Sequence, residues 1–323
     1  MRTPTRKVRA LIKQTFQTED ERGVTAEHWG EEAREKAEGE EWQGLYWQSF
    51  ILTARNINRA ISGDPDVDWL TFTKKRFFPK PVKVALSLGC GYGIVERVGI
   101  DIEIARRFEA YDISPEAVAV AQQEAQKVGV ADRVDYAAAD LNTIELEPGV
   151  FGAVFGAQAL HHIEALEHLL DQIHESLAPD GLFVVNEYVG PSRFQFPDDR
   201  LPFMNELLAV LPESHRRSLR DGSVKSELLR PSAKEVQRVD PSESIRSDEI
   251  MSLIEERFEI VYRADFGGTL LQFVLSDIAG NFDPEDPKDM AMIDLVCLYE
   301  KTLIDQGVLP SDFVYLVAKR RAS

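Results

Sequence analysis

The sequence predicts a doubly wound α/β fold, in which helices cover both faces of a mostly parallel sheet. Between residues 84 and 188, apolar runs that suit buried strands alternate with segments at helical spacing, which is the pattern of βαβ units. The first run, Val84–Leu88, has no polar face and stops in three glycines at alternate positions, Gly89, Gly91 and Gly93. We therefore expect a buried parallel strand, a glycine turn and then a helix.

The composition is that of an ordinary soluble globular protein. The chain has 323 residues, of which 44% are hydrophobic and 28% are charged, and this length suits one large domain with additions or two domains. The 37 Lys and Arg residues against 55 Asp and Glu residues give a net charge of −18. Such a charge argues against broad electrostatic binding to nucleic acid or to anionic membranes.

The sequence also carries no sign of membrane insertion or secretion. No apolar segment follows Met1 and Arg2, and no run is long enough to cross a bilayer. The two cysteines, Cys90 and Cys297, form no CxxC pair, so we expect reduced thiols rather than a disulfide. The expectation is a cytoplasmic protein without a nucleic-acid or membrane partner.

Residues 1–80 are expected to form a helical N-terminal extension. The charged stretch Glu31–Glu38 indicates a solvated helix or a mobile arm. The apolar residues of Trp42–Ile51 fall at helical spacing, and the stripe continues to Ile61. A helix packed on the core is favoured, although its aromatic rings would also suit a lid that faces a cationic ligand. A further helix is expected at Val67–Phe78.

The glycine turn is a place where a ligand can rest against backbone N–H groups. Its spacing, G-x-G-x-G, differs from the dinucleotide fingerprint because Ile94 occupies the place of the third glycine. The Walker pattern also fails, since no Gly-Lys-Ser/Thr follows. Asp112 ends the second expected strand, Arg107–Ser114, 19 residues beyond Gly93. That interval is close to the one at which nucleotide-binding folds place a ribose-binding carboxylate.

The alternation of strands and helices continues as far as Tyr188. Ser114 can cap the helix after the second strand, with Pro115 at its first position. The other elements expected here are the helix Ala117–Val128, a third strand Arg133–Leu141, a fourth strand with its loop Val150–Ile163, a helix Glu164–Leu177, the turn Ala178–Gly181 and a fifth strand Leu182–Tyr188.

The glycine stretch resembles motif I of the class I S-adenosylmethionine-dependent methyltransferases, which usually reads acidic-x-G-x-G-x-G. Ser87 stands where that motif has its acidic residue. The run Ala-Leu-His-His-Ile at 159–163 resembles the end of motif IV in the type 11 and type 12 subfamilies, and the turn Ala178–Gly181 resembles the L-x-P-G-G element before strand five. The resemblance covers Val84–Tyr188 and implies that the cofactor is S-adenosyl-L-methionine.

The resemblance further implies a Rossmann-like sheet of seven mostly parallel strands with an antiparallel C-terminal strand. Strands six and seven are expected at Phe258–Arg263 and Phe313–Lys319. The domain boundaries expected are a cofactor-binding core at 81–189, a helical lid insertion at 190–257, and the rest of the core at 258–323 with a helical insertion between strands six and seven. The cofactor-binding residues implied are Ser87, Gly89, Cys90, Gly91, Gly93, Asp112, Ile113, Asp140, Leu141, Ala157 and Gln158.

The two insertions contain helical patterns that are too apolar to stand alone in solvent. These patterns lie at Leu201–Leu211 and Leu270–Ile278, a further helical pattern lies at Met290–Leu303, and Ser247 is expected to cap another helix. We expect the insertions to cover the C-terminal ends of the strands, or else to contact a partner subunit. A homo-oligomer therefore stays open.

The function expected is methyl transfer to a small or medium-sized acceptor, with O-methylation slightly favoured. An oxygen acceptor of high pKa needs a nearby base, and the candidates are His161, His162 and Glu187. Adjacent histidines alone are poor evidence for zinc because the other ligands are missing, so no metal is expected. For Asp140 two interpretations remain, a contact with the adenine amine and a turn-forming role before Asn142.

Two other functions are open. The first is a nicotinamide-dependent oxidoreductase on a Rossmann fold, against which the missing third glycine and the antiparallel C-terminal strand both argue. The second is a non-catalytic protein that binds S-adenosylmethionine or serves as a scaffold. This alternative stays open because Ser87 stands where the motif has an acidic residue.

Overall fold

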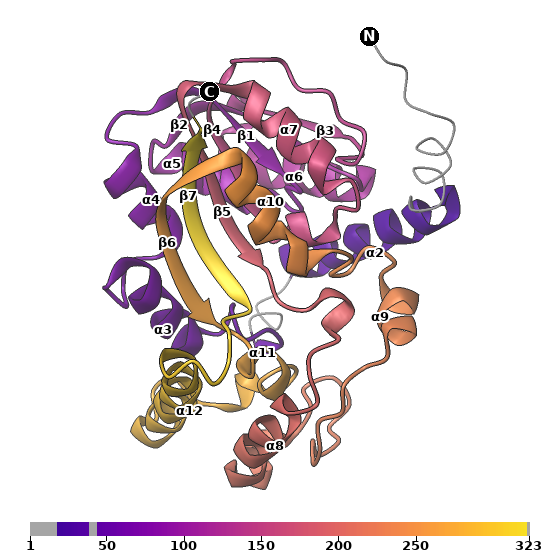
Figure 1. The fold of residues 1–323 in the computed structure, drawn as a ribbon, viewed down its shortest axis with the longest axis vertical. Coiled ribbons are helices and arrows are strands. Elements are labelled where there is room, and N and C mark those ends of the chain that lie inside the picture. Colours follow the sequence, from indigo (N-terminus) through magenta and orange to yellow (C-terminus); the bar gives the residue numbers. More distant parts are fainter. Residues whose placement is uncertain (1–17, 39–43, 322–323) are drawn as a thin grey trace.

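The seven strands form one sheet with helices on both faces, and the computed structural model describes it over residues 18–38 and 44–321 (Figure 1). The strands are β1 (Val82–Leu88), β2 (Ala105–Asp112), β3 (Val134–Ala138), β4 (Phe151–Ala157), β5 (Leu177–Tyr188), β6 (Phe258–Gly267) and β7 (Phe313–Arg320). Their order is β3-β2-β1-β4-β5-β7-β6. Strands β1 to β5 pair in parallel, and β7 runs antiparallel to both β5 and β6. The expected sheet is confirmed.

Side chains alternate along each strand between two hydrophobic clusters, one on each face of the sheet. On β1, Ala85 belongs to one cluster, and Leu86 and Leu88 belong to the other. The first face is covered by α3 (Ile51–Ser62), α4 (Trp69–Phe77), α5 (Ile94–Asp101) and α6 (Pro115–Lys127), and the second by α7 (Leu166–Ser176) and α10 (Ile250–Arg257). Because both faces are buried, the central strands have continuous apolar sequences.

The N-terminal helix α2 (Glu19–Glu38) packs against α6 and is not a mobile arm. A Cβ built on Gly30 would lie 2.7 Å from a carboxylate oxygen of Glu116 and 3.0 Å from Ser114 Oγ. Arg34 pairs with the same Glu116 at 3.0 Å. The charged sequence of this helix therefore reflects one exposed side and ion pairs on the other.

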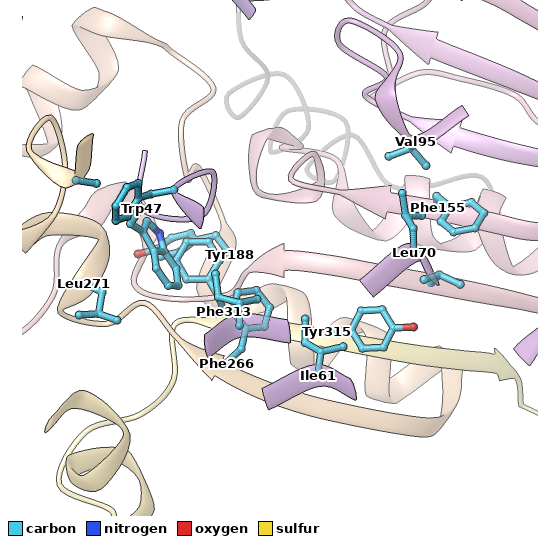
Figure 2. Packing of buried hydrophobic residues seen from close by; sticks show 14 of the residues in the cluster. Trp47, Ile61, Leu70, Val95, Phe155, Tyr188, Phe266, Leu271, Phe313 and Tyr315 are labelled. Atoms are coloured by element: carbon cyan, nitrogen blue, oxygen red, sulfur yellow. The ribbon is translucent and has the colours of Figure 1, made fainter. Parts of the chain in front are cut away.

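The helix expected over Trp42–Ile61 begins later than predicted. Residues 44–50 form turns, and α3 begins at Ile51, while residues 39–43 lie outside the described part of the chain. Trp47 is buried against the rings of Phe266 and Phe313 (Figure 2). This residue serves the core, as the favoured interpretation stated.

The insertions gather at the end of the sheet where the parallel strands terminate (Figure 1). The insertion helices at this end are α8 (Arg200–Val210), α9 (Ala233–Val239), α11 (Leu271–Val274) and α12 (Pro287–Asp305), whereas α10 of the 190–257 insertion packs on the face of the sheet. The helix predicted over Leu270–Ile278 was too long, because the α-helix ends at Val274 and is followed by turns and a short 3₁₀ helix at Ala279–Asn281. Leu270, Leu271, Val274 and Ile278 are nevertheless buried, so the apolar pattern correctly indicated packing.

Two local predictions were wrong. Residues 178–181 lie within β5 rather than in a separate turn, since Leu177 already pairs with Phe151. The register then shifts, and Ala153 pairs with Leu182, which places these four residues in an irregularity of the strand. Ser247 does not cap a helix, because its hydroxyl donates to the carbonyl of Gly190 at 2.8 Å.

Among the described residues, no helix combines the length and hydropathy that a membrane span requires.

Candidate active site

The glycine loop follows the C-terminal end of β1 and leads into α5. Gly89, Gly91 and Gly93 have φ values of 65°, 50° and 80°, a region that residues with a Cβ adopt only at a cost. Gly93 is the N-cap residue of α5, and no side chain caps this helix. The first N–H groups of a helix form an anion- and dipole-binding site, so the loop and helix together can receive a ligand.

The three glycines differ in what surrounds them. A Cβ on Gly89 would lie 2.6 Å from Ala159 Cβ, and a Cβ on Gly93 would lie 2.5 Å from Tyr136 Oη. A Cβ on Gly91 would meet nothing within 4 Å. Packing inside the protein therefore accounts for Gly89 and Gly93, whereas Gly91 presents bare backbone to open space.

Asp112 ends β2 directly beside this loop. One carboxylate oxygen accepts from the N–H of Gly91 at 2.8 Å, and the other accepts from the N–H of Ser114 at 2.9 Å. Burial raises the pKa of Asp112, and these N–H groups partly offset the effect. Since a carboxylate has about four acceptor positions, both oxygens can take a further hydrogen bond from a ligand.

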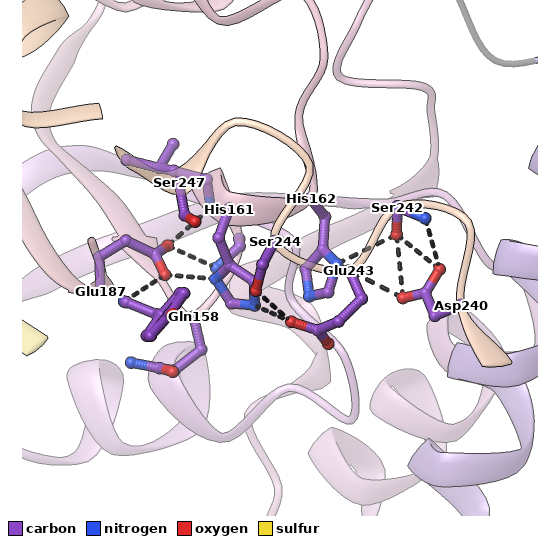
Figure 3. Close-up of polar contacts among 12 residues, drawn as sticks. Gln158, His161, His162, Glu187, Asp240, Ser242, Glu243, Ser244 and Ser247 are labelled. Atoms are coloured by element: carbon purple, nitrogen blue, oxygen red, sulfur yellow. Dashed lines mark hydrogen bonds and ion pairs between the residues drawn. The ribbon is translucent and has the colours of Figure 1, made fainter. Parts of the chain in front are cut away.

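Glu187, on β5, holds the loop that follows β4 in place (Figure 3). Its carboxylate accepts from the N–H groups of Ala159, Leu160 and Tyr188 at 2.8, 2.7 and 2.6 Å. It also binds Nδ1 of His161, and its side chain is fully buried. With four donors around two oxygens, Glu187 has the contacts of a positioning residue rather than those of a free base.

His162 is held by residues from two distant segments. Its Nδ1 lies 3.0 Å from Ser242 Oγ, and that hydroxyl donates to Asp240 at 2.8 Å. Thr25 of α2 donates to the same Asp240 at 3.1 Å. The ring of Trp29, also on α2, lies edge-on at 4.7 Å from the His162 ring. The N-terminal helix and the first insertion thus close over the histidine pair.

The two histidines differ in charge. Burial by itself would lower the pKa of His161, but Glu187 and Glu243 beside it outweigh burial and raise that pKa to about 9. Burial and the neighbouring His161 hold the pKa of His162 well below its usual range. In the structure as it stands, His161 is therefore an imidazolium and His162 a neutral imidazole at pH 7.

The comparison with protein families identifies this part of the chain. The family described as "Methyltransferase domain" matches residues 86–185, which include the glycine loop, Asp112 and the histidine pair. Residues 86–185 are a class I S-adenosylmethionine-dependent methyltransferase domain. The cofactor of this family is S-adenosylmethionine, and the exposed backbone at Gly91 fits a ligand that lies against the loop.

Known proteins of several kinds are similar to part of this chain. A sterol 24-C-methyltransferase of Clavispora lusitaniae is 26% identical over 148 residues, which are 44% of this chain and 38% of that protein. An uncharacterised protein of Synechococcus sp. is 31% identical over 137 residues, 42% of this chain and 32% of its own length. An arginine-hydroxylase of Homo sapiens, NDUFAF5, is 29% identical over 118 residues, 36% of this chain and 32% of that protein. This chain therefore spans only about a third of the length of these curated relatives.

The fold also matches a solved methyltransferase. The structure of a geranyl diphosphate methyltransferase in complex with S-adenosylmethionine superposes with a TM-score of 0.50. The match covers 78% of this chain and 84% of that one at 12% sequence identity. At this identity the likeness shows the shared fold.

After β3, Asp140 is engaged by the protein itself. It accepts from the N–H and the side-chain amide of Asn142, both at 2.9 Å, and pairs with Arg22 of α2 at 3.0 Å. Its neighbour Leu141 is buried in the hydrophobic cluster on the α7 side of the sheet. Of the two interpretations, the turn-forming role is present in the structure, while contact with the adenine stays a prediction.

The other predicted cofactor residues lie around the same strand ends. Cys90 is buried, and burial raises the pKa of its thiol well above the usual range. Ile113 is partly exposed after β2. Ala157 ends β4, and Gln158 has a φ of 53° and donates its side-chain amide to the carbonyl of Asn186 at 3.1 Å. This bond holds Gln158 against β5.

A buried carboxyl group that sequence reasoning missed lies next to Ser87. It belongs to Glu96 on α5, which contacts Ser87 and lies 3.5 Å from Tyr136 Oη, while its other oxygen has no hydrogen-bond partner in the described structure. The motif expects an acidic residue at position 87, and this chain instead brings one beneath the loop from the following helix.

Sequence reasoning also missed the residues that surround the histidines from outside the domain. Asp240, Ser242 and Glu243 come from the first insertion, and Arg22 and Trp29 come from α2. No local sequence pattern places them at the strand ends. The apolar patterns of the insertions did predict that these segments cover the strand ends, but they did not indicate which residues reach the histidines.

Proposed function

We propose that this chain transfers the methyl group of S-adenosylmethionine to a hydroxyl group of a small or medium-sized acceptor. The observation that carries the proposal is Gly91. Its backbone faces open space, whereas its two neighbouring glycines are explained by internal packing. Positive φ with open space also occurs at ordinary turns, but Gly91 lies between the end of β1 and α5 and is hydrogen-bonded to Asp112, where a ligand can approach the main chain.

The orientation of the cofactor follows from its neighbours. We assign the ribose hydroxyls to Asp112, because its carboxylate is fixed by two N–H groups and retains acceptor positions. The methionine half then lies along the glycine loop and toward the loop after β4. This orientation places the methyl group near His161 and His162.

The reaction itself is an in-line displacement. A lone pair of the acceptor oxygen forms the new bond to the methyl carbon, and the C–S bond breaks with its electron pair passing to sulfur. The hydroxyl proton leaves to a base or to solvent. The sulfonium is already activated, so the protein chiefly supplies position and a dry site. An alcohol also needs help to lose its proton, and we place that help in the polar site around His161 and His162.

Binding is tested with two matched variants, Gly91→Val and Gly129→Val. Gly129 also has positive φ, at 73°, and also has nothing within 4 Å of an added Cβ, but it lies after α6, away from the glycine loop. Both variants therefore carry a similar backbone strain. Isothermal titration should show loss of S-adenosylhomocysteine binding only for Gly91→Val. Equal binding by both variants would show that the glycine loop is merely a turn.

Turnover is tested with methyl-labelled S-adenosylmethionine and a panel of phenols, catechols and aliphatic alcohols. Labelled ether products, accompanied by S-adenosylhomocysteine, are the expected result. Label in a new carbon–carbon or carbon–nitrogen bond would show that the acceptor atom is carbon or nitrogen rather than oxygen. Cofactor binding without turnover on a broad panel would favour the non-catalytic alternative. Binding of a nicotinamide cofactor in place of S-adenosylmethionine would overturn the proposal.

A further inference from the structure

The site after β4 contains three side chains whose chemistry suits a metal ion. His161, His162 and Glu243 each offer one donor atom, and these atoms all lie within 4.8 Å of one another. His161 Nε2 is 3.8 Å from Glu243 Oε1. Ligand atoms around a tetrahedral zinc ion lie about 3.3 Å apart, given bonds of about 2.0–2.1 Å. Small side-chain rotations would bring the three donors to that spacing.

Both histidines are oriented as metal-bound histidines are. A histidine ligand usually donates its other ring N–H to a carboxylate or similar group, which fixes the tautomer and the ring plane. Nδ1 of His161 is hydrogen-bonded to the carboxylate of Glu187. Nδ1 of His162 is hydrogen-bonded to Ser242 Oγ, and this hydroxyl in turn donates to Asp240. Because Ser242 uses its own proton on Asp240, its oxygen accepts from Nδ1, and the lone pair of His162 stays on Nε2.

That nitrogen is unpaired in the part of the chain that the structure describes. His162 Nε2 is buried and has no hydrogen-bond partner among the described residues. Figure 3 shows the ring of His162 with Nδ1 toward Ser242 and the other nitrogen on the side of His161 and Glu243. A buried, unpaired ring nitrogen is unfavourable, and an ion bound between the three donors would satisfy it.

The charge around the pair also favours a cation. Three carboxylates lie on the histidines: Glu187 and Glu243 against His161, and Asp240 against His162. Arg193 also packs here, and its guanidinium donates to the backbone carbonyl of Glu243. Without an ion, the protonated His161 offsets part of this negative charge, and an ion that displaced its proton would take over that role.

We propose that His161, His162 and Glu243 bind a divalent first-row transition ion, with Glu187 and the Ser242–Asp240 pair as outer partners that orient the histidines. Two imidazoles and one carboxylate are the donor set of His₂Glu zinc sites and of non-haem iron sites with open positions. An acceptor hydroxyl on such an ion loses its proton more easily. This last step rests on the proposed function, whereas the site itself rests only on the geometry of its ligands.

The sequence argument against a metal was that the histidine pair had no further ligand nearby. The structure supplies one from the first insertion, 81 residues beyond His162 along the chain, as Glu243.

The test uses chelator-treated protein titrated with Zn²⁺, and with Co²⁺ as a spectroscopic substitute. The wild-type chain should bind one ion, and bound Co²⁺ should give the visible absorption of a four- or five-coordinate site. Glu243→Gln should weaken Zn²⁺ binding by at least about tenfold, and Glu187→Gln by about 10- to 100-fold, the range for outer partners. Glu227→Gln, the same change at an exposed position of the same insertion, should have no effect.

A second readout needs no variant. The chain has six histidines, and in ¹⁵N NMR spectra only the Nε2 signals of His161 and His162 should shift when Zn²⁺ is added. No Zn²⁺ binding, unchanged affinity of a folded Glu243→Gln protein, or shifts confined to other histidines would each overturn the proposal. S-adenosylhomocysteine binding to the chelated protein is measured separately. If the cofactor binds and the metal does not, only the metal site fails.

Discussion

The residues of the cofactor site combine two tasks, since the groups that would touch a ligand also hold the protein together. Asp112 is the clearest case. Its carboxylate ties Gly91 to Ser114, and so links the glycine loop to the start of α6. Glu96 is a second case, because it lies fully buried beneath the loop beside Ser87. Substitutions here should therefore be compared with matched changes elsewhere.

Asp112→Ala should weaken S-adenosylhomocysteine binding by about 10- to 150-fold, because hydrogen bonds to a charged group contribute about 1.5–3 kcal/mol. The measurement is isothermal titration, with thermal melts to show that the variant folds. Asp132→Ala, at an exposed position before β3, is the control. Unchanged affinity in the Asp112 variant would refute the assignment of the ribose to this residue.

Glu96 should make stability depend on pH. Burial raises its pKa to about 7, and contacts with Ser87 and Tyr136 offset this only in part. A folded-state pKa above the unfolded value of about 4.3 means that the protonated form is favoured on folding. Its contribution is thus fully present below about pH 4.3 and is lost as the pH rises through about 7.

The variant Glu96→Gln removes this titration. Between pH 5 and pH 8, the wild-type free energy of unfolding should fall relative to that of the variant by about 3 kcal/mol, as urea denaturation would measure. Glu147→Gln, an exposed glutamate, should follow the wild type. Parallel curves for wild type and Glu96→Gln would show that Glu96 does not titrate in this range.

At the scale of elements, α2 acts as a strap across the carboxyl ends of the strands. Arg22 pairs with Asp140, Thr25 binds Asp240, and Trp29 packs on His162. The helix therefore touches both the expected adenine end of the site and the histidine pair. Its close approach to α6 depends on Gly30, which has no room for a side chain.

Substitutions at two glycines of α2 distinguish an effect on helix propensity from an effect on the packing of α2 against α6. Gly30→Val should push α2 away from Ser114 and Glu116, and amide hydrogen exchange along the helix should rise. Gly23→Val lies on the same helix with nothing within 4 Å of its Cβ. Because it removes a flexible glycine without a clash, it should leave exchange equal or slower. If both variants exchange alike, the packing of α2 on α6 does not hold the strap in place.

At the scale of the whole molecule, the domain at 86–185 is completed by segments that lie outside it. The described part of the N-terminal extension and the 190–257 insertion meet at Asp240, through Thr25 and Ser242. These contacts bring α2 and the insertion together beside His162. A closed site excludes water from the reacting pair.

S-adenosylhomocysteine should therefore slow amide hydrogen exchange in α2 and in residues 240–247, as well as in the glycine loop. The measurement needs no knowledge of the acceptor. Residues 287–305, which form α12, serve as the internal reference, since the hydrogen bonds and ion pairs of Asp112, His161 and His162 involve none of them. Protection limited to the glycine loop would mean that the insertion is not a lid, and an interface role would then be favoured.

The sequence by itself determined the sheet, the glycine turn, the family and the positions of Asp112 and the histidine pair. These features depend on short-range sequence patterns. Strands buried on both faces need continuous apolar runs, and a backbone with positive φ needs glycine. Only the tertiary structure decided which groups meet those residues. Thr25 and Asp240 are 215 positions apart, and His162 and Ser242 are 80 apart. Contacts at such separations depend on how whole segments pack, and no local pattern records them. The same physical reason explains why Glu187, predicted as a candidate base, has its oxygens filled by backbone donors that only the folded loop brings to it.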